Sequence, residues 1–324
     1  MKKHCTDLLG MSASTGSKVA KKFILVQEFD GLPKLSDFKL VEEPLVESLC
    51  QGEILAKAEW LSVDPYMRCK FVDPVAVGQV LKGAQVARVL KSRCSEFPEV
   101  MPKLQGLPDS YAIGSLGMPG NAAYYGLIDL CQPKKGDVLV VNGAGGAVGS
   151  LVGQIGKIKG CTVLAFAGTE EKLQWMKNDL GFDHVFNYKD VNLNETFKKF
   201  APEGIDIFFD NVGGDFVGPV MKHMAKSGRY CKSGSISEYN YSNDYQCADP
   251  KAFPEFKTRK VQLKKLFMES ITIDWFDRIN KIQAWILEGK IKVRETVVES
   301  FENMPQAFID LFEGKNVGKM VIKA

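Results

Sequence analysis

The chain has 324 residues, of which 45% are hydrophobic and 25% are charged, with a formal net charge of +3. This composition is typical of a soluble globular protein, and so small a charge excludes a protein built mainly to bind nucleic acid or a charged membrane surface. Its eight cysteines stand singly without a C-x-x-C pair, and it has three histidines. This pattern argues against a disulfide framework and a zinc site. We therefore expect reduced thiols, no metal and a cytoplasmic location.

The N-terminal third predicts a small β domain. Residues 1–20 are polar, with one acidic residue and no apolar run, so we expect a disordered extension there and no secretory signal. A mitochondrial presequence is the alternative, but this stretch contains no arginine. Strand-like stretches follow at Phe23–Phe29, Phe38–Val41, Glu53–Val63 and Val80–Leu90. They predict a largely antiparallel β domain over residues 21–120.

The stretch from Asp137 to Gly160 carries the clearest pattern in the chain. An apolar run over residues 138–141 predicts a buried strand, and Gly143, Gly146 and Gly149 follow at three-residue spacing. The apolar residues then take helical spacing, at Val148, Leu151, Val152, Ile155 and Ile158. A strand, a glycine turn and an amphipathic helix in this order are typical of a dinucleotide-binding site. A membrane helix and a glycine turn without a ligand are the alternatives, but the change of period within the run argues against a membrane helix.

Strands and helices alternate through the rest of the chain. Further strands are predicted at Cys161–Ala167, Val185–Tyr188, Ile205–Phe209 and Arg229–Lys232, each preceded by a plausible helix. This alternation predicts an α/β fold with a doubly wound parallel sheet of the Rossmann type. We expect this nucleotide-binding domain to cover residues 121–288, and residues 289–324 to return to the β domain.

Lys172 is the residue that favours NADPH over NADH. A site selective for NADH usually has an acidic residue at the end of the second strand, but here that strand ends in Ala167, Gly168 and Thr169. With Thr169 as N-cap, Lys172 falls in the first helical turn, where the helix dipole disfavours a cation. A bound 2′-phosphate would explain the lysine. A solvated lysine without a function is the alternative.

Other candidate ligand contacts lie where the later strands end, because ligands bind outside the carboxyl ends of parallel strands. Asn211 could bond the nicotinamide or ribose, or it could only form the turn before two glycines. Tyr188 could stack near the adenosine, although a half-buried strand tyrosine is commoner. The strand predicted at Arg229–Lys232 is followed by Ser233, Gly234 and Ser235.

Seven motifs together resemble one known family. They are VDPYMR (63–68), GMPGNAAYYGL (117–127), VVNGAGGAVGSLVGQIGKIKGC (140–161), GFDHVFNYK (181–189), FDNVGG (209–214), FENMP (301–305) and NVGKMVIKA (316–324). They closely resemble the prostaglandin reductases, also called leukotriene B4 12-hydroxydehydrogenases, of the zinc-independent medium-chain dehydrogenase/reductase superfamily. The resemblance implies a GroES-like, mainly antiparallel β domain beside the Rossmann domain. It also implies reduction by NADPH of the carbon–carbon double bond of lipid enones and 2-alkenals, and allows a homodimer. A quinone reductase of the same superfamily and an impaired NADPH-binding variant are the alternatives.

The resemblance also implies which residues form the site. The family's cofactor contacts fall on Gly146, Ala147, Val148, Gly149, Lys172, Tyr188, Asn211, Ser233, Gly234, Ser235, Ile236, Ser237, Tyr239 and Asn316. A backbone stretch beside the nicotinamide matches Ile271, Thr272 and Ile273. Negative charge develops on the carbonyl oxygen of an enone during reduction, so without zinc a hydrogen-bond donor must stabilise it. Tyr66 and Tyr239 are the catalytic candidates, and Arg68 is a candidate for substrate contact. A structural role is the alternative for Tyr66 and Arg68.

The chain also departs from the family. A stretch of β structure that the family carries between the positions of Val100 and Met101 is missing, and Leu263 stands at about the place of a usual tyrosine. Both departures lie on the substrate side. We therefore expect the nucleotide-binding half to be intact and turnover to be in doubt.

Overall fold

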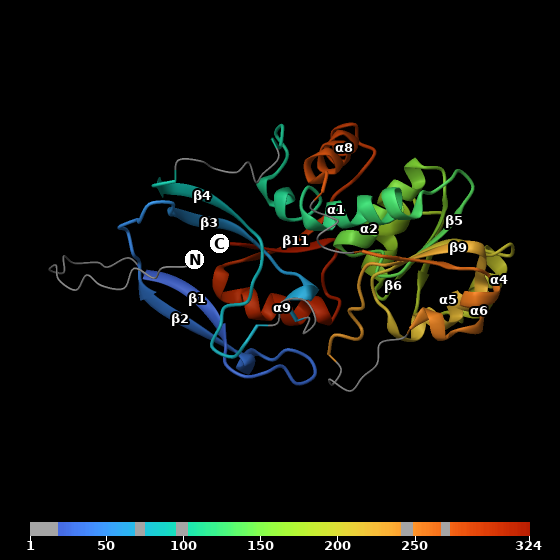
Figure 1. Cartoon of the computed structure of the whole chain (residues 1–324), viewed down its shortest axis with the longest axis horizontal. Coiled ribbons are helices and arrows are strands. Elements are labelled where there is room, and N and C mark those ends of the chain that lie inside the picture. The colour runs from blue at the N-terminus through green and yellow to red at the C-terminus, as the bar shows by residue number, and fades with distance from the viewer. Residues whose placement is uncertain (1–18, 69–74, 95–102, 241–248, 267–272) are drawn as a thin grey trace.

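The structure is a computed structural model that describes residues 19–68, 75–94, 103–240, 249–266 and 273–324. The molecule is elongated, with a β-rich part at one end and an α/β part at the other (Figure 1). Residues 1–18 of the predicted extension lie outside the described residues, and so does the position between Val100 and Met101.

A parallel sheet of six strands forms the α/β part, in the order β10-β9-β8-β5-β6-β7. Its strands are β5 (Val138–Val141), β6 (Thr162–Ala167), β7 (His184–Asn187), β8 (Ile205–Asp210), β9 (Met224–Lys232) and β10 (Gln262–Lys265). The accompanying α-helices are α1 (Met118–Tyr124), α2 (Ala147–Ile158), α3 (Glu170–Gln174), α4 (Leu193–Phe200), α5 (Val217–His223), α6 (Pro254–Thr258) and α8 (Trp275–Leu287). The prediction of a doubly wound α/β fold is thus confirmed. The sixth strand, β10, was not expected.

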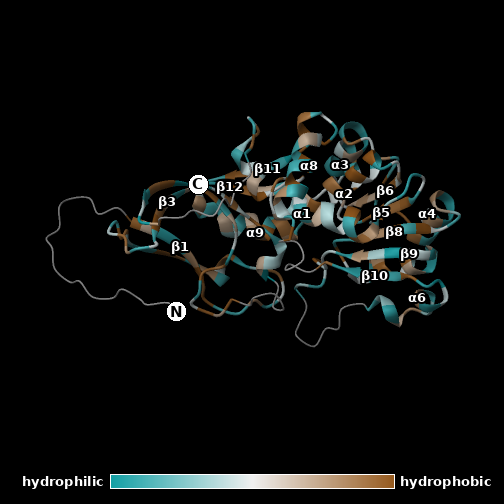
Figure 2. Cartoon of the chain, turned by 45° about the horizontal axis from the view of Figure 1, so that its top comes forward, coloured by the Kyte–Doolittle hydropathy of each residue, from teal (hydrophilic) through white to brown (hydrophobic). Residues whose placement is uncertain are grey.

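The central strands are apolar on both faces because helices cover both sides of the sheet. In β5, Leu139 and Val141 belong to a cluster that also contains residues of α1, α2 and α8. Val140, which points to the other face, packs in a cluster with residues of α4 and α5. Figure 2 shows hydrophobic stretches in the strands at the centre of this part. A parallel sheet buried in this way positions the turns at its carboxyl edge.

The glycines of α2 meet three different neighbours. A Cβ on Gly149 would lie 2.4 Å from the carbonyl oxygen of Gly143, and one on Gly153 would lie 2.3 Å from the ring of Phe182. Only Gly156 meets the strand below the helix, where a Cβ would lie 2.5 Å from Leu139. Gly149 therefore packs the helix against the glycine turn, and not against the strand.

The β-rich part contains two small sheets. One consists of β1 (Val19–Leu25) and β2 (Phe38–Pro44), and the other has the order β11-β12-β3-β4. The strands of the second sheet are β3 (Ile54–Ser62), β4 (Gln85–Ser92), β11 (Glu295–Glu299) and β12 (Lys319–Lys323). All their pairings are antiparallel except that of β11 with β12. The mainly antiparallel prediction is confirmed, and helix α9 (Met304–Phe312) packs into this part.

The second sheet combines both ends of the chain. Strand β12 lies between β11 and β3, so C-terminal residues complete a sheet that N-terminal residues begin. Strand β4 lies at the edge of this sheet, where Val89 is 47% and Leu90 53% exposed.

In the ranges that the structure describes, no helix has both the length and the apolar character needed to cross a membrane.

Candidate functional site

The strand order of the parallel sheet identifies one preferred ligand position. The chain passes from β5 to β6 on one side, and β8 later pairs with β5 on the other side. Ligands of open α/β sheets bind at such a switch point, outside the carboxyl ends of the strands. The loops after β5, β6, β7, β8 and β9 therefore define the candidate site.

The turn after β5 consists largely of glycines and leads directly into helix α2. Gly143 adopts a φ of +57°, in the left-handed region that glycine takes without strain. The helix α2 begins at Ala147, directly after Gly146, and points its first amide groups toward the same edge. A helix N-terminus with free N–H groups and a positive dipole end is an anion site when a glycine turn gives access to it. Gly146, Ala147, Val148 and Gly149 lie at this place, and their contact with a pyrophosphate stays a prediction.

A buried carboxylate holds the turns after β5, β8 and β9 together. Asp210 is fully buried and accepts hydrogen bonds from the side-chain amide of Asn142 (2.6 Å), the hydroxyl of Tyr230 (2.5 Å) and the backbone N–H groups of Val212 (3.0 Å) and Gly213 (2.8 Å). Four donors compensate a buried charge that would otherwise be costly. Burial, followed by the charge of Asp210, raises the pKa of Tyr230.

Asn211 is tied to the same network. Its backbone N–H donates to the side-chain oxygen of Asn142 (2.7 Å), and its side-chain amide donates to the backbone carbonyl of Asn142 (2.9 Å). The structure therefore gives Asn211 a structural role between β5 and β8. Its contact with a nicotinamide or ribose stays a prediction. Asn142 was missed in the sequence, although a polar residue directly after a buried strand is a usable signal.

The loop after β9 folds back onto the turn after β8. The N–H groups of Ser233 and Gly234 donate to the carbonyl of Asp210 (2.9 and 3.0 Å), and that of Ile236 donates to Asn211 (3.3 Å). Ser237 donates its hydroxyl to Val212 (2.7 Å). The remaining residues of the predicted set are also here: the N–H of Ser235 donates to the hydroxyl oxygen of Tyr239 (3.3 Å). The structure thus brings this loop and Asn211 together at the switch point.

Lys172, Tyr188 and Lys189 gather at the end of β6. A Cβ on Gly168 would lie 2.8 Å from the Tyr188 ring and 3.2 Å from the Lys189 side chain. A Cβ on Gly145 would lie 2.8 Å from the side chain of Lys172. Two lysines therefore approach the place where an NADH-selective site carries an acid. Lys189 was missed in the sequence, although it directly follows the predicted Tyr188.

Lys172 is half-buried, so it is not the fully solvated lysine considered from the sequence. Its ammonium donates to the carbonyl of Gly314 at 2.7 Å. Burial lowers its pKa to about 8, the nearby charge of Glu171 partly opposes this, and Lys189 adds to the lowering. A cation that burial and a like charge destabilise gains from a bound anion.

The C-terminal segment reaches the glycine turn from the β-rich part. Gly318 donates its N–H to the carbonyl of Gly145 at 2.9 Å, and Gly146 and Gly318 form an isolated parallel bridge. Asn316 is buried and donates its side-chain amide to the carbonyl of Gly318 (2.8 Å). Asn316 therefore supports the segment that contacts the turn, and its predicted contact with the cofactor is untested.

Tyr66 and Arg68 lie on a short 3₁₀ turn (Pro65–Arg68) of the β-rich part. The hydroxyl of Tyr66 is bonded to Asp64, and burial together with this carboxylate raises the pKa of the tyrosine. Arg68 is 2% exposed, lies 4.6 Å above the ring of Phe29 and donates to the carbonyl of Gly31 (3.0 Å). These contacts favour the structural alternative for Arg68.

The nicotinamide segment is only partly described. Ile271 and Thr272 lie outside the described residues. Ile273 is 63% exposed, and its carbonyl accepts a hydrogen bond from Arg278 at 2.5 Å. Leu263, at the place of the family's tyrosine, lies in β10.

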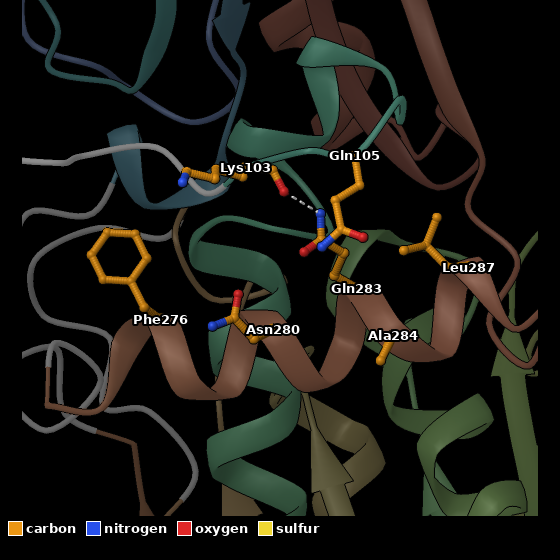
Figure 3. Close-up of a pocket in the computed structure, with 7 residues that line it drawn as sticks. All are labelled: Lys103, Gln105, Phe276, Asn280, Gln283, Ala284 and Leu287. Atoms are coloured by element: carbon orange, nitrogen blue, oxygen red, sulfur yellow. Dashed lines mark hydrogen bonds between the residues drawn. The ribbon is translucent and has the colours of Figure 1, made fainter.

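A cavity of about 420 Å³ lies on the outer side of α8 (Figure 3). It is lined by Lys103, Gln105, Phe276, Asn280, Gln283, Ala284 and Leu287. Gln283 closes one side by donating to the carbonyl of Lys103 at 2.6 Å (Figure 3). None of the predicted site residues lines it. We therefore place the site at the switch point of the sheet, where the donors and glycines are.

Among the described residues, no group of three or more histidine, cysteine or acidic side chains is placed to hold a metal ion. Cys131, Cys161 and Cys231 are not in disulfides. Burial raises the pKa of Cys161 to about 11, so this thiol stays protonated near neutral pH. Function without zinc stays a prediction.

Comparison with known proteins follows the same division of the chain. Residues 21–100 match the family model described as the N-terminal domain of oxidoreductase, and residues 147–272 match the one described as zinc-binding dehydrogenase. Prostaglandin reductase 1 of Oryctolagus cuniculus is 42% identical over 93% of this chain and 92% of its own. The NADPH-dependent curcumin reductase of Escherichia coli is 35% identical over 94% of this chain and 96% of its own.

A solved structure of a similar protein matches this chain over nearly its whole length. CurA of Vibrio vulnificus in complex with NADPH matches with a TM-score of 0.84 and 36% identity, covering 94% of this chain and 99% of that one. A doubly wound sheet with a glycine turn beside a mainly antiparallel β part defines an oxidoreductase of the medium-chain type. The chain belongs to the medium-chain dehydrogenase/reductase superfamily, in the group that contains prostaglandin reductase 1.

Proposed function

We propose that the protein is an NADPH-dependent reductase of the carbon–carbon double bond in α,β-unsaturated ketones and aldehydes. The observation that carries the proposal is the 42% identity with a prostaglandin reductase over 93% of the chain. A curcumin reductase that depends on NADPH supports the same cofactor and the same type of reaction. The resemblance seen in the sequence motifs points to 15-oxo-prostaglandins and 2-alkenals as substrates.

The residues at the switch point fit NADPH. Gly146 to Gly149, at the start of α2, would hold the pyrophosphate, because the helix end favours an anion and Gly146, which comes directly before the helix, carries no Cβ. Lys172 and Tyr188 would hold the 2′-phosphate and the adenosine, with Lys189 close by. Asn211 and the loop from Ser233 to Tyr239 would hold the nicotinamide end.

When bound, NADPH supplies a hydride to the β-carbon of the enone. The residues of this chain must then stabilise the negative charge that develops on the carbonyl oxygen of the substrate. On the cofactor side the candidate is the ribose hydroxyl of NADPH, oriented by Tyr239, whose own hydroxyl oxygen accepts the N–H of Ser235. Tyr66, the candidate from the β-rich part, has its hydroxyl bonded to Asp64, so it would border the substrate rather than donate to this oxygen. A proton must finally reach the α-carbon to give the saturated carbonyl product.

One observation favours a weakened enzyme as the second candidate function. Strand β4 is the edge of its sheet, with Val89 and Leu90 about half exposed. The family's additional stretch follows this strand in the sequence. An exposed apolar edge agrees with a substrate side that lacks part of its structure.

Two further proposals concern the cellular location and the oligomeric state of the protein. Cytoplasmic location is supported by the cysteines without disulfides, because reduced thiols are the rule there. A homodimer is supported only by the family resemblance. Size-exclusion chromatography with light scattering would measure the mass directly.

The decisive experiment follows the oxidation of NADPH by purified protein with a 15-oxo-prostaglandin, a 2-alkenal and a quinone in parallel. We expect NADPH consumption with the first two and a product two mass units heavier that retains its carbonyl. Turnover of the quinone alone would instead assign a quinone reductase. NADPH binding without any turnover would assign the weakened variant.

A further inference from the structure

A buried ion pair lies where the β-rich part meets the glycine turn. The ammonium of Lys319, at the start of β12, lies 3.3 Å from the carboxylate of Asp64, which follows β3. Each residue is only 4% exposed. The ammonium also donates to the carbonyls of Val63 and Met320, both at 2.7 Å. Since an ammonium has three N–H groups, all of its donors have partners.

Asp64 connects this pair to Tyr66. Its carboxylate accepts the hydroxyl of Ser62 and is bonded to the hydroxyl of Tyr66. A carboxylate only accepts, so the single proton of Tyr66 points toward Asp64. The tyrosine is thereby fixed in one orientation, and its donor is committed to Asp64.

Lys319 is also connected to the cofactor turn. It directly follows Gly318, whose N–H bonds the carbonyl of Gly145 and whose backbone pairs with Gly146. A Cβ on Gly318 would lie 1.9 Å from the carbonyl oxygen of Arg294, and its φ is +68°, so only glycine fits this close approach. The position of Lys319 is therefore set by the glycine turn.

One more charge faces the pair. The carboxyl of Glu295 in β11 lies near Lys319 and accepts the hydroxyl of Ser110 at 2.6 Å. Replacing a buried ion pair by apolar residues is often neutral or stabilising. Stability alone therefore does not account for two charges in this place.

We propose that Asp64 and Lys319 are positioning residues, which hold the Tyr66 hydroxyl in a fixed relation to the pyrophosphate turn. The proposal rests on the proposed function, in which Tyr66 borders the reacting enone. It also assigns Tyr66 a part in binding the substrate through its ring, which the bond between its hydroxyl and Asp64 holds in place. The donor to the developing oxyanion then comes from the cofactor side, where Tyr239 would orient the ribose hydroxyl.

A double-mutant cycle tests the link. Lys319→Met and Tyr66→Phe are each expected to lower kcat/KM for a 2-alkenal about tenfold, the size of one ordinary hydrogen bond, with the Kd of NADPH unchanged. In the double variant, Lys319→Met should add nothing, because the hydroxyl it positions is gone. If Lys319→Met lowers kcat/KM by the same factor in Tyr66→Phe as in the wild-type protein, the proposal is overturned. Lys323→Met, an exposed lysine of the same strand, is the control and should leave both constants unchanged.

A ¹⁹F NMR measurement tests the same link without relying on turnover, and a double variant guards against loss of the fold. With 3-fluorotyrosine in the chain, the ¹⁹F resonance missing in Tyr66→Phe belongs to Tyr66. It should move in Lys319→Met and in Asp64→Asn/Lys319→Met, where no charge stays buried alone, and remain in place in Lys323→Met. An unmoved resonance in the folded double variant would contradict the proposal. If the wild-type protein reduces no enone, but the Tyr66 resonance still moves between wild type and Lys319→Met, the proposed function is refuted and the positioning link is kept.

Discussion

The ammonium of Lys172 lies 2.7 Å from the carbonyl oxygen of Gly314, which follows helix α9 in the β-rich part. One side chain thus connects the first turn of α3 with the loop that leads to Asn316. The predicted 2′-phosphate position therefore lies beside a contact between the two parts of the molecule.

Lys172→Ala is expected to weaken the binding of NADPH by about 1.5–3 kcal/mol, the range for hydrogen bonds to charged groups, and to leave NADH almost unchanged. The Kd values from titration of nucleotide fluorescence measure this. Lys177→Ala, on an exposed lysine five residues on, is the control and should change neither. Equal losses for both nucleotides would remove Lys172 from the phosphate site.

The affinity for NADPH should fall as the pH rises through about 8. Burial lowers the pKa of Lys172 to about 8, so in the free protein the charge that attracts the phosphate is present below this pH and lost above it. The loss approaches about tenfold per pH unit above the pKa. NADH affinity should stay flat, and the slope for NADPH should vanish in Lys172→Ala. Parallel titrations from pH 6.5 to 9.5 check both.

Gly149→Ala should lower the melting temperature and the affinity for NADPH. The added Cβ would lie 2.4 Å from the carbonyl oxygen of Gly143 and 2.8 Å from the Cα of Ala144, and backbone atoms cannot turn aside. Gly218→Ala, in α5, is the matched control because its nearest neighbour would be at an ordinary 3.4 Å. That control should be neutral or stabilise by up to about 1 kcal/mol. Thermal unfolding with and without NADPH separates the two effects.

Activity should survive exhaustive chelation. The described part of the chain has no cluster of three potential ligands, and the cysteines lack the spacing of a zinc site. Initial rates before and after dialysis against a chelator are the measurement. Stoichiometric zinc in a metal analysis of the native protein would overturn the prediction.

Restoring a family-like stretch between Val100 and Met101 should raise the rate of enone reduction. The chain as given should bind NADPH, because the parallel sheet keeps its strands and the glycine turn, but reduce enones more slowly than prostaglandin reductase 1. The structure adds a reason, since β4 is left as an exposed edge that another strand could cover. If the restored protein is no faster, the missing stretch is harmless.

The sequence predicted those elements whose burial is uniform. Strands such as β5 and β8 are covered on both faces, so their apolar runs were visible without the structure. Strand β10, with the sequence QLKK, carries no such run because it is a short edge strand. Its pairing with β9 depends on the tertiary structure, which a local pattern does not contain.

The site could be predicted only where a local motif carries it. The glycine turn and Lys172 are local features, and both could be proposed from spacing and helix position alone. The bond between Asn142 and Asp210 joins residues 68 positions apart, and that between Lys319 and Val63 spans 256 positions. No spacing rule links such residues, so these contacts became visible only with the fold.

The parallel bridge between Gly146 and Gly318 also determines how the molecule can open. This bridge and the contact of Lys172 with Gly314 both tie the β-rich part to the phosphate end of the site, so a rotation of that part against the α/β part would have its fulcrum there. Displacement grows with distance from a fulcrum, so such a rotation would move the nicotinamide end far more than the phosphates. The dinucleotide would then stay attached while the crevice admits the enone and releases the reduced product, and the oxidised dinucleotide would leave last.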